Sequence, residues 1–169
     1  RIAEALVDRE LLPADSSLEN WAARLADDYT ARCEAAIARC REMPGASVAL
    51  EKLFEKGCLL FVNSATPAIP LRKLTELRKW GHFFQAVYGA EATKAENLLS
   101  IARATGAERT EMVHVGDQLD DQDGAHQFGC HFVAMTAGIA DSPVRKSPLL
   151  VEDLRDLPAL LDEISREAS

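Results

Sequence analysis

Hydrophobic residues near the start of the chain recur at spacings of three and four, which is the pattern of amphipathic helices. Residues 2 to 12 keep this spacing until Leu12-Pro13 breaks it. A second, longer helix is predicted over residues 18 to 40, on the positions Leu18, Trp21, Leu25, Tyr29, Ala36, Ile37 and Cys40. The first 42 residues are therefore predicted to be helical throughout.

From Pro44-Gly45 onward, short apolar runs alternate with helical stretches. This alternation is the signature of βαβ units and predicts an α/β fold class, with a three-layer, Rossmann-like core around a parallel sheet. We predict a buried parallel strand at residues 58–62 and further strands at 86–88, 112–115 and 131–135. Five helices are predicted in this part of the chain. The first covers residues 47–56 and stops at Gly57, and the second has Pro70 near its first turn, Leu71, Leu74 and Leu77 on one face and Gly81 as its stop. The third covers residues 94–105 and stops at Gly106, the fourth ends at Phe128, and the last runs through Leu154, Leu157, Leu161 and Ile164.

The composition is that of a globular chain. With 169 residues, of which 47% are hydrophobic and 27% charged, the sequence is long enough for one full core and a small accessory unit. A formal charge of −8 disfavours nucleic acid and anionic membranes as partners. The four cysteines form no CxxC pair, and the chain contains neither a signal-peptide pattern nor an apolar stretch of about 18 residues. These features favour a reduced, cytoplasmic protein.

Polar side chains follow two of the predicted strands and begin one of the predicted helices. Ser64 comes after the strand at 58–62, Asp117 and Asp121 come after the strand at 112–115, and Lys94 opens a helix. Because ligands bind at the carboxyl ends of parallel strands, Ser64 and the Asp117/Asp121 pair should converge. A hydroxyl, an ammonium and two carboxylates suit phosphoryl transfer, with Asp117 as a Mg²⁺ ligand and Asp121 acting through water or orienting the site.

Each of these residues also has an ordinary structural interpretation. Ser64 alone is typical of a strand end or turn, and Lys94 alone of a solvated helix position. Asp117 and Asp121 alone fit an N-cap and a first-turn helix charge. His114 lies in the middle of a predicted strand, and we interpret it as a buried, hydrogen-bonded histidine rather than a catalyst.

Three segments in order resemble motifs II, III and IV of the haloacid dehalogenase superfamily, in the branch of phosphoglycolate phosphatase and β-phosphoglucomutase. The segments are Phe61-Val62-Asn63-Ser64-Ala65-Thr66-Pro67, then Tyr88-Gly89 with Lys94, then Val115-Gly116-Asp117-Gln118-Leu119-Asp120-Asp121. The resemblance covers about residues 43 to 140. It implies that the phosphoryl group is bound by Ser64, Ala65 and Lys94, that Lys94 also stabilises the nucleophile, and that Asp117 ligates Mg²⁺ with the support of Asp121.

The resemblance also implies a domain division. Residues 1–42 resemble part of a helical cap, and residues 43–169 resemble the core domain. Caps of this kind close over small phosphorylated substrates and exclude water, so substrate choice should lie partly in this helical region.

The family's nucleophile is an aspartate in an Asp-x-Asp motif at the end of the first strand. The sequence contains no such motif, and the nearest approach, Asp8-Arg9-Glu10, lies in a helical pattern. We therefore expect the nucleophile and the first strand upstream of Arg1. Because that strand is central in the family's sheet, we expect the sheet formed by these 169 residues to have a gap there.

The expected function is a magnesium-dependent hydrolase that removes phosphate from a small phosphorylated metabolite through an aspartyl-phosphate intermediate. A phosphomutase and a phosphonate hydrolase are alternatives, as is a dehalogenase, which needs no metal. A catalytically inactive relative, kept as a binding or regulatory protein, is the alternative from a different class. The sequence does not identify the substrate or the oligomeric state.

Overall fold

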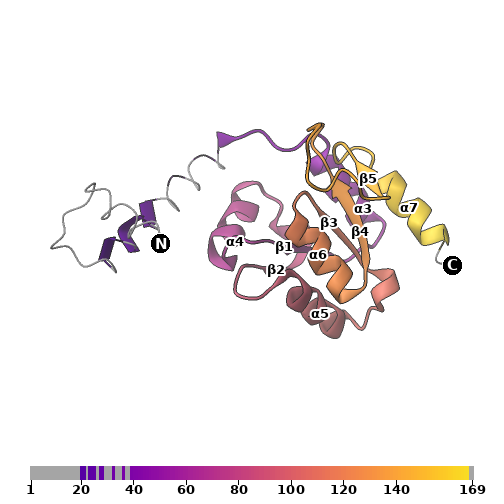
Figure 1. Cartoon of the computed structure of the whole chain (residues 1–169), viewed down its shortest axis with the longest axis horizontal. Helices are drawn as coiled ribbons and strands as arrows, with labels where there is room; N and C mark the ends of the chain where they lie inside the picture. The colour runs from indigo at the N-terminus through magenta and orange to yellow at the C-terminus, as the bar shows by residue number, and fades with distance from the viewer. Residues whose placement is uncertain are drawn as a thin grey trace. The chain divides into compact units, whose positions relative to one another are not determined.

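A computed structural model describes residues 20, 21, 23–25, 27, 28, 32, 36 and 39–167 of the chain. The chain divides into two compact units, residues 1–40 and 41–169 (Figure 1). In the first unit, every described residue between 20 and 39 is helical, as predicted for this stretch. Residues 40–42 are not helical, so the prediction that the first 42 residues are helical throughout is wrong at its end, where the chain leaves the helix ahead of the turn at Pro44-Gly45. The helix predicted over 2 to 12, and Asp8-Arg9-Glu10 within it, lie outside the described residues.

The second unit alternates helices with short strands (Figure 1). This confirms the predicted α/β class, and most predicted elements are found within one or two residues of their expected bounds. The elements are α3 (Ala46–Glu55), β1 (Leu60–Asn63), α4 (Ala68–Leu77), η1 (Gly81–Phe83), β2 (Phe84–Tyr88), α5 (Lys94–Thr105), η2 (Arg109–Glu111), β3 (Val113–Gly116), α6 (Leu119–Phe128), β4 (His131–Met135), β5 (Leu150–Val151) and α7 (Leu157–Glu167).

All strand pairs in this unit are parallel, but the strands form two sheets. β1 pairs with β2, and β3, β4 and β5 form a second sheet in that order. Among the described residues, β1 pairs with β2 alone and β3 with β4 alone, so each of the two strands has one unpaired edge. The parallel arrangement is therefore divided in its centre, where the sequence analysis expected a strand to be lacking.

Helices cover both faces of the strands. On one face, α3 and α7 pack against the strands through a cluster that includes Leu53, Val133 and Leu157. On the other face, α5 and α6 pack through a cluster that includes Leu98 and Phe128. Both clusters also take partly buried side chains from β1, so the two sheets share one three-layer core.

The run at residues 58–62 was predicted as a buried strand, and this is wrong in its burial. β1 begins two residues later, at Leu60, and all four of its residues are only half-buried. Leu59 is 57% exposed. The reason is that β1 has a strand neighbour on one side only, so its apolar side chains lack the cover that a central parallel strand receives.

Gly81 was predicted to stop the second helix, and this too is wrong. α4 ends at Leu77, and the chain turns at Lys79, whose φ of 59° is left-handed. Gly81 instead begins η1. Trp80 accounts for the earlier turn, because its ring nitrogen donates a hydrogen bond to Ser47 Oγ over 3.2 Å and ties the chain to α3. Leu77, expected on a packed face, is 67% exposed as a result.

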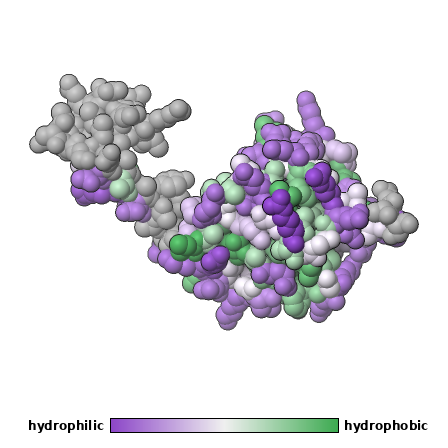
Figure 2. All heavy atoms as spheres, turned by 90° about the horizontal axis from the view of Figure 1, so that it is seen from below, coloured by the Kyte–Doolittle hydropathy of each residue, from purple (hydrophilic) through white to green (hydrophobic). Residues whose placement is uncertain are grey.

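Large apolar side chains remain at the surface of this unit, and Figure 2 shows such patches among hydrophilic atoms on one face of the molecule. Three of them follow the carboxyl ends of strands: Ile69 after β1, Leu119 after β3 and Ile139 after β4, each more than half exposed. In the part of the chain that the structure describes, every helix is too short or too polar to cross a bilayer.

Candidate active site

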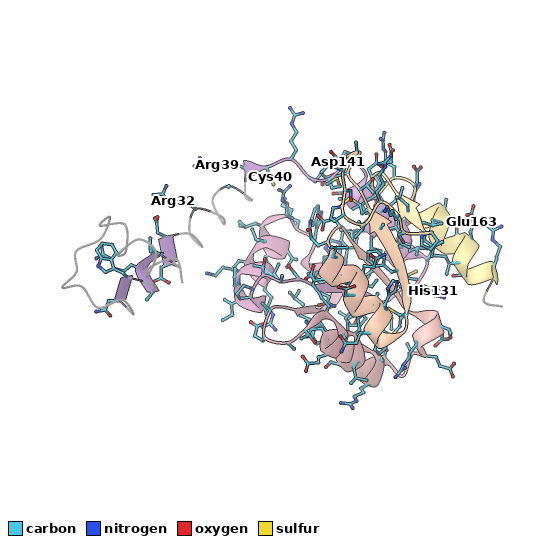
Figure 3. All side chains as sticks on the ribbon, in the orientation of Figure 1. Arg32, Arg39, Cys40, His131, Asp141 and Glu163 are labelled. Carbon is cyan, nitrogen blue, oxygen red and sulfur yellow. The ribbon has the colours of Figure 1, made fainter. Side chains whose placement is uncertain are left out.

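The carboxyl edge of the strands carries a polar cluster built around Lys94. In Figure 3, His131 marks the start of β4 and Asp141 lies in the loop beyond its carboxyl end, so the carboxyl edge of the strands is on the side of Asp141. The Lys94 ammonium donates to the Asn63 carbonyl over 2.8 Å and lies 2.7 Å from Asp121 Oδ1. The side chains of Lys94 and Asp121 are only 12% and 9% exposed. The fold thus brings together the end of β1, the start of α5 and the start of α6.

Asp121 is the most heavily hydrogen-bonded carboxylate of the cluster. Its Oδ1 accepts from Lys94 and lies 3.3 Å from His114 Nε2. Its Oδ2 accepts from the backbone N–H groups of Asp117 and Gln118, over 3.3 and 3.2 Å. Because these N–H groups begin α6, Asp121 also caps the helix within a capping box. Both oxygens are engaged, which suits a residue that orients its neighbours.

The surroundings of Asp121 favour its charged form. Burial alone would raise the pKa of this carboxyl. Hydrogen bonds from His114 and Lys94, the charge of Lys94 and the N–H of Gln118 outweigh that effect and lower the pKa from 3.8 to about 2. Asp121 is therefore an anion at neutral pH and a permanent counter-charge for the Lys94 ammonium.

His114 is buried and hydrogen-bonded, as the sequence pattern indicated, and is only 6% exposed. Its position in the site was missed, because its partner Asp121 lies on the next helix and no spacing rule joins the two. A charged carboxylate can only accept, so the 3.3 Å contact requires an N–H at Nε2 of His114. His114 therefore contacts Asp121 from within the buried part of the site.

Two asparagines also belong to the cluster, and the sequence analysis singled out neither. The side-chain amide of Asn63 donates to the Lys94 carbonyl over 3.1 Å. The side-chain amide of Asn97 donates to Asn63 Oδ1 over 2.9 Å and to the Gly89 carbonyl over 3.0 Å. The signal that could have found Asn97 is its place on the apolar face of α5, where an amide is costly unless it is hydrogen-bonded.

Ser64 and Ala65 lie directly after the Asn63 carbonyl that Lys94 contacts. Ser64 is half-buried, its N–H donates to the Tyr88 carbonyl over 3.1 Å, and its Oγ accepts from the N–H of Thr66 over 3.2 Å. No acceptor is found among the described residues for the Ser64 hydroxyl proton or for the Ala65 N–H. Both groups can donate to an anion, and their phosphate-binding role stays a prediction.

Asp117 is exposed at the end of β3 and is the carboxylate of the cluster with the most open coordination. Its Oδ2 accepts one hydrogen bond, from the side chain of Gln118 over 3.1 Å. The described residues contain no group of three or more His, Cys, Asp or Glu side chains that could enclose a metal. Mg²⁺ needs only one or two protein carboxylates and takes its other ligands from water and phosphate, so the exposed carboxylate of Asp117 is compatible with this ion. The metal-binding roles of Asp117 and Asp121 stay predictions.

Two glycines permit the close packing of the cluster. A methyl group at Gly116 would overlap the side chain of Asp121. A methyl group at Gly124, in α6, would overlap Cβ of Lys94. α5 and α6 can therefore approach closely enough for Lys94 to reach Asp121 only because position 124 has no side chain.

We expect Gly124→Ala to destabilise the protein, although glycine-to-alanine changes inside helices usually stabilise by about 1 kcal/mol. Overpacking against Cβ of Lys94 costs about 1–3 kcal/mol, because the obstacle lies close to the backbone and cannot rotate away. Urea unfolding measures the effect. Gly81→Ala is the control, since a methyl group there meets nothing within 4 Å, and its change should stay below about 0.5 kcal/mol. An increase in stability for Gly124→Ala would contradict the packing described here.

A protein-family model matches most of this chain. The model for haloacid dehalogenase-like hydrolases matches residues 10–135, which include every residue of the polar cluster. No curated protein matches the chain.

Solved structures with the same fold are distant in sequence. A predicted phosphoglycolate phosphatase from Haemophilus somnus is 21% identical, with 71% of this chain and 57% of that chain covered and a TM-score of 0.65. A subfamily IA hydrolase of the haloacid dehalogenase superfamily from Geobacter sulfurreducens is 23% identical (95% and 73% covered, TM-score 0.71). A candidate β-phosphoglucomutase from Thermotoga maritima is 18% identical (91% and 74% covered, TM-score 0.72). The present sequence thus spans less than two thirds of the first of these chains.

Proposed function

The chain belongs to the haloacid dehalogenase-like hydrolases, and from this premise we propose that it removes phosphate from a small phosphorylated metabolite in a magnesium-dependent reaction with an aspartyl-phosphate intermediate. The observation that carries the proposal is the Lys94 ammonium, which is held 2.8 Å from the Asn63 carbonyl and 2.7 Å from Asp121. Ser64 and Ala65 follow Asn63, and their donors have no acceptor among the described residues. Fixed donors of this kind stabilise the charge of a transferring phosphoryl group.

The charged residues of the cluster and the donors of Ser64 and Ala65 each have a defined part in the proposed reaction. The Ser64 hydroxyl and the Ala65 N–H donate to phosphoryl oxygens, and Lys94 offsets their negative charge. Asp121 keeps Lys94 in place and remains charged itself. Asp117 would hold Mg²⁺, which supplies further positive charge to the phosphoryl oxygens.

The covalent steps require an aspartate nucleophile. Its carboxylate attacks phosphorus, the ester oxygen leaves with a proton as the alcohol, and water then splits the acyl phosphate into inorganic phosphate and the free carboxylate. We propose that this aspartate ends a strand that precedes Arg1 and pairs with both β1 and β3. The two strands offer one unpaired edge each among the described residues, and they belong to one shared core.

We also propose a small metabolite, rather than nucleic acid, as the substrate, and the cytoplasm as the site of action. The net charge of −8 opposes attraction to a polyanion, so binding of an anion depends on the local positive group at Lys94. Among the described residues, Cys58 and Cys130 are free thiols, which is the usual state in a reducing compartment.

The first experiment measures hydrolysis of 4-nitrophenyl phosphate by protein from the complete reading frame, with Mg²⁺ and with EDTA. We expect inorganic phosphate and nitrophenol in equal amounts, with turnover only in Mg²⁺. Equal turnover in EDTA would overturn the magnesium part of the proposal. A folded protein that binds inorganic phosphate but hydrolyses neither this ester nor a panel of sugar phosphates would instead be an inactive, phosphate-binding member of the family.

A further inference from the structure

Asn97 occupies a position at which an amide side chain is unfavourable on general grounds. It is 4% exposed and lies on the face of α5 that also buries Ala95, Leu98 and Ile101. Asparagine is a weaker helix former than alanine or leucine, and a buried amide must find partners for its polar atoms. An apolar residue would serve the packing better, so a different requirement explains the amide.

The requirement lies in what the amide joins. Its two N–H groups donate to the Asn63 side chain at the end of β1 and to the Gly89 carbonyl just after β2, over 2.9 and 3.0 Å. Asn97 therefore links α5 to the carboxyl ends of β1 and β2. Among the described residues it is the only side chain that bonds to both strand ends of this sheet at once.

The hydrogen bonds of Asn97 are connected, through Asn63, to the Lys94 ammonium of the candidate site. Asn63, held by Asn97, donates its own side-chain N–H to the Lys94 carbonyl over 3.1 Å. Its backbone carbonyl accepts from Lys94 Nζ over 2.8 Å, and Ser64 is the next residue. Lys94 is thus bound to Asn63 at both its main chain and its side-chain tip, and the direction of Asn63 is fixed by Asn97.

We propose that Asn97 is a positioning residue. Through Asn63, it fixes the position of the Lys94 ammonium relative to Ser64 in the loop that follows β1 (the Ser64 loop), without touching the substrate. The inference rests on the proposed phosphoryl-transfer function. Without the hydrogen bonds of Asn97, the Asn63 side chain can rotate away. Lys94 then keeps its ion pair with Asp121 but is no longer held at a fixed distance from the Ser64 loop. Catalysis by fixed charges is sensitive to such displacements, because a shift of about 1 Å can lower a rate by up to a hundredfold.

The test is a double-mutant cycle in the complete protein with 4-nitrophenyl phosphate. We expect Asn97→Leu to lower kcat by about tenfold or more while KM changes by less than about threefold. In a Lys94→Met background, the same change should lower kcat by less than about twofold, because the positioned group is already absent. A purely structural role would give the same factor in both backgrounds and would overturn the inference.

Two further variants separate this role from a general loss of stability. Thr105→Val removes hydrogen bonds at the opposite end of α5, where Oγ1 donates to the Ile101 carbonyl over 2.9 Å and accepts from the N–H of Ala107 over 3.2 Å. It should lower the melting temperature without changing kcat. Asn97→Ser is smaller and leaves a single hydroxyl donor, and it should lower kcat in the same direction if the leucine variant does not fold. A kcat equal to that of wild type in either folded Asn97 variant would overturn the inference.

Inorganic phosphate distinguishes a failure of this inference from a failure of the proposed function. If the wild-type protein hydrolyses no ester but binds phosphate, the phosphatase proposal fails. The inference then still requires Asn97→Leu and Lys94→Met to weaken phosphate binding non-additively, by about tenfold each. An unchanged Kd in Asn97→Leu would overturn the inference alone, and a wild-type protein that neither turns over nor binds phosphate would overturn both.

Discussion

Replacing Lys94 by methionine is expected to lower kcat for phosphate ester hydrolysis by about a thousandfold, the upper range for loss of one fixed charge-stabilising donor. The same change is expected to reduce the free energy of unfolding by about 3–5 kcal/mol, because the buried Asp121 carboxylate loses its counter-charge. The remaining partners of Asp121 are His114 and the two N–H groups that begin α6. Steady-state kinetics and urea unfolding of the same preparation measure both effects.

Lys56→Met is the matched control for this prediction. Lys56 forms an equally short pair with Asp162, 2.6 Å apart, but the two side chains are 44% and 49% exposed. Exposed pairs contribute about 0–1 kcal/mol, so this variant should retain both stability and activity. A Lys94→Met variant that keeps kcat within about threefold of wild type would remove Lys94 from the proposed reaction.

Replacing Asp117 by alanine is the second large effect that we expect, and here activity and stability should separate. Loss of the Mg²⁺ ligand should lower kcat by at least about a hundredfold, because the metal contributes several kcal/mol of transition-state stabilisation. Stability without metal should change by no more than about 0.5–1 kcal/mol, since the carboxylate is exposed and, among the described residues, is hydrogen-bonded only to the side chain of Gln118.

A second readout for Asp117→Ala does not depend on turnover. Mg²⁺ should raise the melting temperature of the wild-type protein and leave that of Asp117→Ala unchanged, because binding to the native state alone stabilises it. Asp120→Ala is the control, since Asp120 is an exposed first-turn residue of α6 that serves the helix dipole. Equal loss of the Mg²⁺ effect in both variants would indicate general electrostatics rather than ligation by Asp117.

The helices and strands of the second unit were largely predictable because their signals are local. α5 begins and ends as predicted, since Thr93 and Glu96 form a capping box at its start and Gly106 takes a left-handed conformation at its end. The end of α4 was not predictable from position, because Trp80 ties it to Ser47 on a distant helix. β5 was not predicted either, because two residues give no periodic pattern.

The candidate site was predictable in its charged residues and not in its supporting ones. Ser64 and the Asp117/Asp121 pair were expected to converge from their places in the strand order, and Lys94 was assigned to the site by the family resemblance. The structure places Lys94 2.7 Å from Asp121. His114, Asn63 and Asn97 act through contacts between elements far apart in sequence, for which single-sequence periodicity contains no information. Their joint signature is chemical: polar side chains at positions that would otherwise be apolar.

The division between β1 and β3 also has a consequence that we expect for the folding of this unit. Each strand pair joins consecutive strands, as in the pairing of Leu60 with Phe84 and of Val113 with His131, so each pairing closes a short loop of chain. Short loops close rapidly, and we expect the two sheets to form early and independently of one another. Docking of α5 against α6 then becomes the late step, and with it the meeting of Lys94 and Asp121. We therefore expect the Lys94–Asp121 pair to form in that step, and amide hydrogen exchange within the α5–α6 contact to be faster than within the paired strands.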